Sequence, residues 1–228
     1  MSKLRVLVAC EYSGRVREAF RRLGHDAWSC DLLPAEDGSE FHFQGDALDY
    51  IGGPIGYSHR NPFHWDIVIA HPPCTYLANS GAKHLYLGMK KENGRNEDRW
   101  QKMRDGAAFF RRMLDCGAPF VAVENPVMLG HAAKLVGQEF AQSIQPWQFG
   151  HMEVKRTCLW LKNLPPLVPT NDVYDEMMKL PYGERAKVHH ASPGPDRWKE
   201  RSRTYTGIAD AMAVQWSEHV LQQMRAAA

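Results

Sequence analysis

The residue best placed for chemistry in this sequence is Cys74, which directly follows two prolines. Residues 66–70 before this corner are an acid and four apolar residues, and they predict a buried parallel strand. Pro72 and Pro73 have fixed φ angles and no amide hydrogens, so the corner after the strand is stiff. Open α/β sheets bind ligands at the carboxyl edge. We therefore predict that the corner presents Cys74 as a nucleophile.

Glu124 is a second residue whose position favours chemistry. It follows the apolar residues 120–123, which predict another buried strand, and it precedes Asn125 and Pro126. Burial disfavours the charged form of a carboxyl group, so we predict a raised pKa for Glu124 and a role in proton transfer. The alternative is a structural carboxylate that caps the next helix.

The beginning of the chain predicts a cofactor site. Residues 4–10 predict a buried strand, residues 11–14 a turn that contains a glycine, and residues 15–23 an amphipathic helix that ends at Gly24. Free amides and the helix dipole meet a ligand at such a corner. An ordinary strand-to-helix turn has the same pattern and is the alternative.

Two acids at later strand ends strengthen this prediction. Asp31 ends a strand predicted at residues 27–30, and Asp46 lies in the short strand predicted at residues 41–49. Acids at these places accept hydrogen bonds from ribose hydroxyls. Asp31 alone has the alternative of a surface turn residue. Together with the first turn, the two acids indicate a cofactor that contains a nucleoside.

Further elements must hold these groups in place. Apolar spacing predicts helices at residues 98–115 and 207–224, and closing strands at residues 144–149 and 155–161 that pair as a hairpin. Residues 51–65 are predicted as a loop.

Two irregular segments are of functional interest. The basic, glycine-bearing segment after Cys74 is predicted as a lid, with a solvated surface connection as the alternative. Residues 163–203 are predicted as a small irregular insertion that is basic enough to contact phosphate.

Composition limits the class of protein. The chain has 228 residues, which favours a single domain over residues 1–228, and its net charge of +2 allows a polyanionic partner without requiring one. The apolar runs are too short for a membrane span, and no signal peptide is apparent, so we expect a soluble, cytoplasmic protein.

The cysteines and histidines do not predict a metal or disulfide framework. The five cysteines are odd in number and form no CxxC pair, and His189-His190 has no second pair of ligands nearby. We expect no metal. The cysteines other than Cys74 are predicted to be small buried hydrophobes.

These motifs resemble the DNA (cytosine-5)-methyltransferases, and in particular their compact, phage-like forms without a large target-recognition domain. Pro-Pro-Cys followed by Glu-Asn-Pro is the most specific part of the resemblance, and the motifs occur in family order over residues 6 to 216. The matching residues are Tyr12-Ser13-Gly14, Asp31, Gly45-Asp46, Pro72-Pro73-Cys74, Glu124-Asn125, Arg156 and residues 206–211.

The resemblance implies a Rossmann-like α/β methyltransferase fold with a mostly parallel sheet and an antiparallel closing hairpin. It also implies methylation of C5 of cytosine in DNA, with S-adenosyl-L-methionine as the cofactor. The Cys74 thiolate would add to C6 of a flipped cytosine, Glu124 would contact N3 and the exocyclic amine, and Arg156 would steady the O2 side. The residue after the prolines favours carbon methylation, because methyltransferases of exocyclic amines have an aromatic residue there.

The resemblance assigns two further sets of residues. The cofactor-binding set is Cys10, Glu11, Tyr12, Ser13, Gly14, Asp31, Leu32, Asp46, Ala47, Pro72 and Asp210. The nucleic-acid-binding set is Pro73, Asn79, Ser80, Lys83, Asn125, Lys155 and Arg203.

The expected partner is duplex or single-stranded DNA, with no membrane and no obligate protein partner. Three alternatives remain open at this stage. The chain could be a catalytically silent nucleic-acid-binding relative, a methyltransferase that acts on RNA or a free nucleotide, or one that methylates an exocyclic amine. The small insertion predicts short or relaxed sequence specificity, because few side chains are available to contact base edges.

Overall fold

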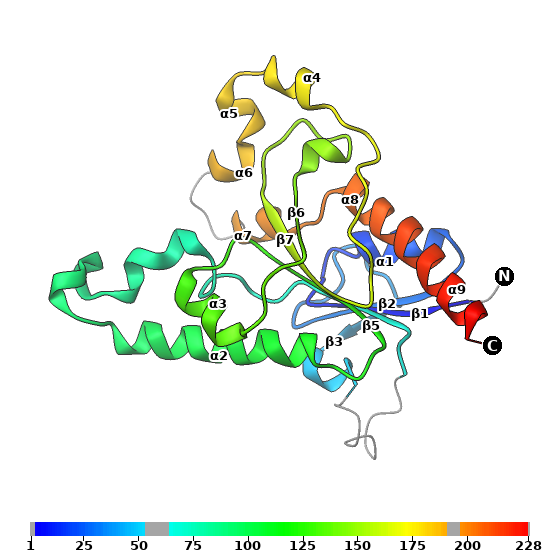
Figure 1. Ribbon diagram of the computed structural model, residues 1–228, viewed down its shortest axis with the longest axis horizontal. Helices are drawn as coiled ribbons and strands as arrows, with labels where there is room; N and C mark the ends of the chain where they lie inside the picture. The colour runs from blue at the N-terminus through cyan, green and yellow to red at the C-terminus, as the bar shows by residue number, and fades with distance from the viewer. Residues whose placement is uncertain (1–2, 53–63, 191–196, 228) are drawn as a thin grey trace.

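A mostly parallel β-sheet forms the centre of the computed structural model, which describes residues 3–52, 64–190 and 197–227 (Figure 1). Within these residues the strand order is β3-β2-β1-β4-β5-β7-β6, and β7 is antiparallel to both of its neighbours. The predicted Rossmann-like α/β fold is therefore confirmed. The strands are β1 (Arg5–Ala9), β2 (Asp26–Asp31), β3 (His42–Gln44), β4 (Ile67–Ala70), β5 (Phe120–Asn125), β6 (Gln142–Ile144) and β7 (Thr157–Lys162).

The closing strands pair as predicted, but the first is shorter and earlier than expected. β6 ends at Ile144, and Pro146–Gln148 form the 3-10 helix η5. Pro146 has no amide to donate to a strand ladder, and its fixed φ favours the first position of a helical turn. The prediction of a strand over residues 144–149 was therefore wrong beyond its first residue.

Helices cover both faces of the sheet. On one face lie α2 (Glu97–Leu114) and α3 (Gly130–Val136), and on the other lie α1 (Arg15–Arg22), α8 (Thr206–Ala211) and α9 (Ser217–Ala226). Side chains of β1 alternate between the two cores, because successive residues of a strand point to opposite faces. The predicted last helix is present, with a π-helical turn over Met212–Trp216 between α8 and α9.

Two parts of the chain project from this core. The first, here called the arm, contains residues 75–97 and continues into the start of α2 at the left of Figure 1. Its 3-10 helices are η2 (Asn79–Leu85), η3 (Leu87–Met89) and η4 (Lys91–Asn93). Leu85 is buried, and its carbonyl accepts a hydrogen bond of 3.0 Å from the Trp100 indole, which fastens the arm to α2.

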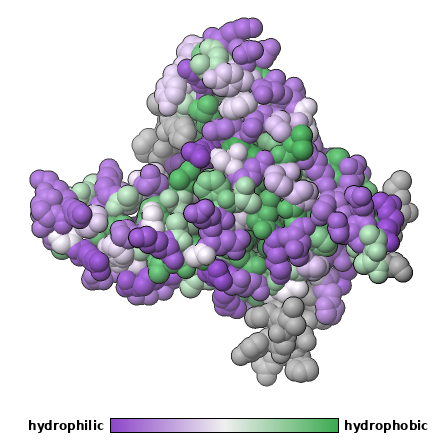
Figure 2. All heavy atoms as spheres, in the orientation of Figure 1, coloured by the Kyte–Doolittle hydropathy of each residue, from purple (hydrophilic) through white to green (hydrophobic). Residues whose placement is uncertain are grey.

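The second projection contains short helices at the top of Figure 1, and the surfaces of both projections are mainly hydrophilic in Figure 2. These helices are α4 (Tyr174–Met178), α5 (Tyr182–Arg185) and α6 (Lys187–His190), followed by α7 (Arg197–Ser202) nearer the sheet. Most of the predicted loop at 51–65 lies outside the described residues, as do residues 191–196 of the 163–203 segment. None of the helices described is long and apolar enough to span a membrane.

Candidate active site at the carboxyl edge of the sheet

The corner after β4 holds Cys74 at the carboxyl edge. The amides of Leu77 and Ala78 donate to the Cys74 carbonyl at 3.0 and 2.9 Å, so the cysteine begins a tight turn. The Asn125 amide nitrogen donates to the carbonyl of Pro72 at 3.2 Å and ties the corner to β5. Cys74 is half-buried, whereas Cys30, Cys116 and Cys158 are buried in the core. Cys10 is half-buried as well, so the prediction that the other cysteines are buried was wrong for that residue. The Cys74 corner is thus fixed and still partly accessible.

Glu124 lies beside this corner and bonds to a histidine from the neighbouring strand end. His71 Nδ1 is 3.1 Å from Glu124 Oε2, and the two side chains are 8% and 17% exposed. Burial raises the pKa of Glu124, but the hydrogen bond from His71 and the charges of Lys155 and His71 outweigh it and lower the pKa below its ordinary value. The prediction of a raised pKa was therefore wrong. Glu124 is ionised at neutral pH.

Glu124 does not cap the next helix. The helix α3 begins at Gly130, and no side chain caps its N-terminus in the described structure. The carboxylate instead points to His71. The structural alternative considered for this residue is therefore not supported.

The thiol of Cys74 is held mainly in its protonated form. Burial and the negative charge of Glu124 raise its pKa, and the positive charges of Arg201 and Lys155 offset part of that rise. Lys155 Nζ donates to the backbone carbonyls of Arg201 and Arg203 at 2.7 and 3.4 Å, which brings these residues to the same edge.

The cations around Cys74 differ from the one expected. Arg156, predicted as catalytic, is exposed, and its Nε donates to Ser143 Oγ at 2.9 Å. Lys155 and Arg201 are the cations that act on the Cys74 thiol. Lys155 was in the predicted nucleic-acid-binding set, but Arg201 was missed, although Arg203 two positions later was in the same set.

The corner after β1 is stabilised by its own acid. Cys10 has a left-handed φ of 57°, and the buried Glu11 carboxylate accepts hydrogen bonds from the amides of Val16 and Arg17 at 2.8 and 3.2 Å. Burial raises the pKa of Glu11, and the charge of His71 and these two amides partly offset the rise. Two helix amides that we expected to be free for a ligand are therefore used by Glu11.

Gly14 is required by the same turn. It has a φ of 68°, which disfavours other residues, and a side chain there would collide with the Arg17 guanidinium. Arg17 is itself buried and forms an ion pair with Asp37. The glycine is therefore needed for packing, whatever ligand binds nearby.

The two predicted ribose-binding acids lie at adjacent strand ends. The Gly45 amide donates to the carbonyl of Asp31 at 2.8 Å, and the Asp46 carboxylate caps the 3-10 helix η1 (Ala47–Asp49) through the Leu48 amide at 2.9 Å. Asp31 is half-buried, and burial raises its pKa. Leu32 beside it is 73% exposed, and Ala47 is buried. The structure therefore brings these four predicted cofactor residues together.

An aromatic column packs beneath Gly45. The rings of Trp28 and Phe43, and of Phe43 and Tyr50, stack with centroids 4.6 Å apart in each pair. A side chain at Gly45 would lie 3.1 Å from the Tyr50 hydroxyl. The absence of a side chain at position 45 is therefore explained by its packing against Tyr50.

Asp210 is not brought to the other acids. It lies on the exposed side of α8 and forms an ion pair with Arg22 in the last turn of α1. Its partner Arg22 and its neighbour Ala209 line a hollow of about 180 Å³ together with Ser13 and Gly14 of the predicted cofactor-binding set.

Residues 199–204, here called the strap, cross the carboxyl edge from α7 to α8 (orange in Figure 1). The Tyr12 hydroxyl donates to the carbonyl of Lys199 at 2.9 Å, and Arg15 donates to that of Thr204 at 3.0 Å. Arg203, predicted to bind nucleic acid, forms an ion pair with Glu36. Together with the bonds from Lys155, these contacts connect the Tyr12 corner to the start of β7.

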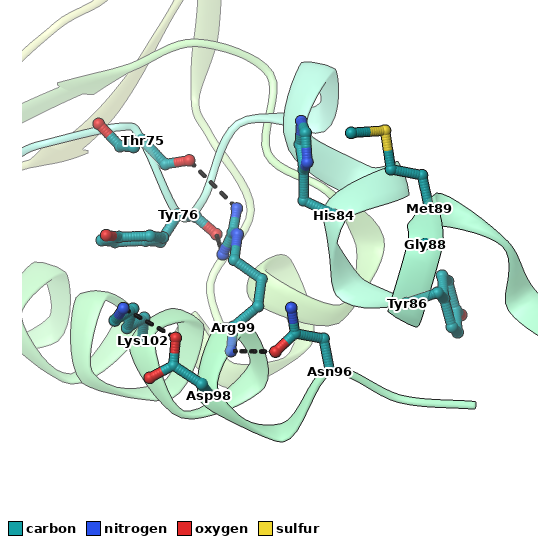
Figure 3. Close-up of a pocket in the computed structure, with 10 residues that line it drawn as sticks. All are labelled: Thr75, Tyr76, His84, Tyr86, Gly88, Met89, Asn96, Asp98, Arg99 and Lys102. Carbon is teal, nitrogen blue, oxygen red and sulfur yellow. Dashed lines mark hydrogen bonds and ion pairs between the residues drawn. The ribbon is translucent and has the colours of Figure 1, made fainter. Parts of the chain in front are cut away.

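The arm carries a hollow of about 560 Å³ next to the Cys74 corner (Figure 3). In its centre the buried Arg99 donates to the carbonyls of Thr75 and Tyr76, at 3.1 Å each, and its guanidinium lies 4.6 Å from the Tyr76 ring. Arg99 therefore braces the turn that follows Cys74. Predicted nucleic-acid-binding residues in this region, namely Pro73, Asn79, Ser80 and Lys83, are exposed.

The described residues contain no group of three His, Cys, Asp or Glu side chains that could hold a metal ion. The side chains of His189 and His190 are outside the described part of the structure.

No protein-family model matches the sequence, and no curated protein matches it. Solved structures that are similar in part include the following three proteins. A protein described as a DNA modification methyltransferase of an E. coli prophage has a TM-score of 0.42 and 16% identity, over 78% of this chain and 56% of that one.

The other two are the Entamoeba histolytica methyltransferase EhMeth and the S. pombe methyltransferase Dnmt2. The first has a TM-score of 0.42 and 15% identity, over 75% of this chain and 58% of that one. The second has a TM-score of 0.38 and 11% identity, over 78% of this chain and 54% of that one. The chain thus spans just over half the length of each protein, and at these TM-scores the likeness is no basis for assigning a function.

Proposed function

We propose that this protein is an S-adenosylmethionine-dependent methyltransferase that modifies C5 of cytosine in DNA. The observation that carries the proposal is a half-buried cysteine, Cys74, beside an ionised carboxylate, Glu124, at the carboxyl edge of the sheet. C5 of cytosine is a poor nucleophile, and a thiolate that adds to C6 makes the ring an enamine that can attack a methyl group. A protein that only binds nucleic acid needs neither group.

The ends of β2 and β3 fit a nucleoside cofactor. Asp31 and Asp46 offer carboxylates to ribose hydroxyls at adjacent positions, and the exposed Leu32 side chain offers an apolar surface to a base. Pro72 belongs to the corner after β4 that also holds Cys74, and β1 separates β4 from the strand that ends in Asp31. When bound, S-adenosylmethionine supplies an electrophilic methyl group.

Each group near Cys74 has a defined task in this proposal. Lys155 and Arg201 favour the thiolate of Cys74 by their charge. Glu124, as a carboxylate, accepts a hydrogen bond from the exocyclic amine of cytosine, and it needs a proton before it can donate to N3. Arg156 would have to leave Ser143 to reach the O2 side of the base.

The arm is the proposed contact surface for the nucleic acid. It follows Cys74 directly, and Lys83, Lys90 and Arg95 are exposed along it. Stacking in a duplex covers the ring face from which a thiolate must add to C6 of cytosine, so the target base must be flipped out at a cost of a few kcal/mol. The exposed cations would bind the phosphates that flank it.

The experiment that tests the proposal is incubation with isotopically labelled S-adenosylmethionine and a panel of duplex DNA, single-stranded DNA and RNA. Digestion to nucleosides and mass spectrometry then identify the product. We expect 5-methylcytosine in DNA. Label on N4 of cytosine or N6 of adenine, label in RNA alone, or no transfer to any substrate would each contradict the proposal.

A further inference from the structure

The hollow of the arm lies between two walls (Figure 3). One wall comes from the turn after Cys74 and from the start of α2, and it carries the cations Arg99 and Lys102. The other wall comes from η2, η3 and the residue between them, and its rings are His84 and Tyr86. The volume of about 560 Å³ falls within the range of roughly 300–1,000 Å³ that is usual for ligand sites. The hollow is therefore large enough for one unit of a polymer.

Arg99 is a buried cation that forms no ion pair with any residue of the described structure. It is 8% exposed, and its guanidinium donates only to the neutral backbone carbonyls of Thr75 and Tyr76 among those residues, which uses two of its five N–H groups. Burial lowers the pKa of Arg99, and the neighbouring Asp98 is bonded to Lys102 instead, at 2.8 Å. A buried charge without a counter-charge is costly, so the hollow favours an anion.

The other lining groups match a nucleotide. The hollow is lined by two cations, Arg99 and Lys102, and one carboxylate, Asp98, so with His84 counted as neutral it has a net charge of +1, which is opposite to that of a phosphodiester. Asn96 accepts from the Arg99 amide through Oδ1 at 3.3 Å, so its amino group is left to donate to the edge of a base. Aromatic rings such as those of the second wall stack on bases.

The hollow begins one residue from the candidate nucleophile. Thr75 lines it and directly follows Cys74, and consecutive Cα atoms are about 3.8 Å apart. Neighbouring nucleotides of one strand are separated by a similar step, about 3.4 Å along the axis of a stacked helix. A strand whose cytosine reaches Cys74 therefore has its next nucleotide at the hollow.

We propose that the hollow holds the nucleotide directly next to the target cytosine in the same strand, with its phosphate against Arg99 and Lys102 and its base against the rings of His84 and Tyr86. This inference rests on the proposed methylation of cytosine in DNA. It gives the buried cation a counter-charge, and it fixes the position of the strand relative to the thiol. Stacking tolerates every base, so this contact sets the register of the strand and adds little sequence specificity.

A purely structural Arg99, which only braces the turn after Cys74, is the competing explanation, and photochemical cross-linking separates the two. Short single-stranded DNA carries 5-iodouracil directly on the 5′ or the 3′ side of its one cytosine, and the linked peptides are identified by mass spectrometry after irradiation. We expect cross-links to the lining residues Tyr76, His84, Tyr86 or Met89 from one of these two positions, and none from a position several nucleotides away. Cross-links only to residues outside the hollow, or no cross-links at all, would overturn the proposal.

Binding of the same DNA to variants of exposed lining residues tests the two halves of the site without disturbing Arg99. Lys102→Ala should lower the slope of log affinity against log salt concentration by about 0.7, because one phosphate contact is lost. Lys134→Ala, which removes an exposed cation of α3 outside the hollow, is the matched control and should keep the slope. His84→Ala should weaken binding about fivefold or more by loss of stacking. An unchanged slope in Lys102→Ala, or an unchanged affinity in His84→Ala, at wild-type thermal stability would overturn the proposal.

These measurements distinguish failure of this inference from failure of the proposed function, because neither requires methyl transfer. If the cross-links lie in the hollow but incubation with labelled S-adenosylmethionine gives no 5-methylcytosine, the proposed function fails and the nucleotide site remains. If 5-methylcytosine forms but 5-iodouracil beside the cytosine never links to the lining residues, the inference fails and the proposed function remains.

Discussion

The corners after β1 and β4 lie side by side in the sheet and use their polar groups in opposite ways. At the first corner the Glu11 carboxylate accepts two amides of α1, so the polar groups of the turn satisfy one another. At the second corner two prolines offer no amides, and His71 Nε2 and Asn125 Oδ1 are buried without partners among the described residues. The hydrogen bonds of the first corner stabilise its turn, whereas the second corner leaves two polar atoms available to a ligand.

This difference shows where function is to be sought along one sheet edge. Both corners follow buried apolar strands and both contain a cysteine, so neither composition nor position separates them. What separates them is whether their buried polar atoms are satisfied, because unsatisfied groups in native proteins tend to mark sites of function. The predictions below test this contrast.

The largest expected effect is that of Cys74→Ala at the second corner. Removal of the thiol should reduce methyl transfer by more than about 10³-fold, because no other group can form the bond to C6. S-adenosylmethionine binding, measured by calorimetry, should be unchanged. Cys116→Ala, which alters a cysteine buried at the end of α2, is the control and should remain active. An undiminished yield of 5-methylcytosine from Cys74→Ala would show that Cys74 is not the nucleophile, and the difference between the two corners would then have no link to catalysis.

Glu124→Gln should lower the turnover number by about 10²-fold, since the amide cannot pass a proton to N3 of the base. The Michaelis constant for DNA should change much less. Steady-state kinetics with a labelled methyl group measure both. Normal turnover would mean that the carboxylate has no part in proton transfer.

The pH dependence of Cys74 alkylation should reflect its neighbours. Burial and Glu124 raise the pKa of this thiol, so its rate of reaction with iodoacetamide should rise about tenfold per pH unit and continue to rise above pH 9. In Glu124→Gln the negative charge is gone, so the pKa should fall and the rate should level off at lower pH. Peptide mass spectrometry follows Cys74 separately from the other cysteines. A wild-type plateau below pH 9 would contradict this account.

The smallest effect is expected at the first corner, and it concerns stability. Glu11→Ala leaves the amides of Val16 and Arg17 without their acceptor and should lower the free energy of unfolding by about 2 kcal/mol. Urea denaturation measures the change, with the exposed Glu40→Ala as the control. If Glu11→Ala instead abolished cofactor binding at full stability, the first corner would be a ligand site as well.

The sequence was sufficient to predict the sheet and the two corners. In runs such as residues 67–70 every side chain is apolar and buried, on both faces of the sheet. This pattern is typical of a parallel strand covered by helices on both sides. The stiffness of the Cys74 corner follows directly from its two prolines. These features depend only on residues that are close together in the chain, so they can be predicted from the order of the amino acids.

Features that depend on contacts across strands were missed. The pKa of Glu124 was predicted in the wrong direction, because its partner His71 lies 53 positions away and only the pairing of β4 with β5 brings the two together. The charge of Lys155 rather than that of Arg156 acts on Glu124, because Arg156 is engaged by Ser143 in β6 and Lys155 by the strap, and neither contact is visible in the sequence. The role of the strap could not be predicted, because nothing in its composition indicates the residues that it contacts.

The strap has a consequence for the order in which the protein becomes active during synthesis. A nascent chain that has reached residue 190 already contains every strand of the described sheet, both corners and the arm. It still lacks the carbonyls that hold Lys155 and Tyr12, and the Arg201 charge that favours the thiolate. Domains generally fold as units, and α8 and α9 cover one face of the sheet, so the thiol environment is completed only when residues 199–226 have been added. The cysteine would thus acquire its final reactivity only after residues 199–203 have been synthesised and have docked on the sheet edge.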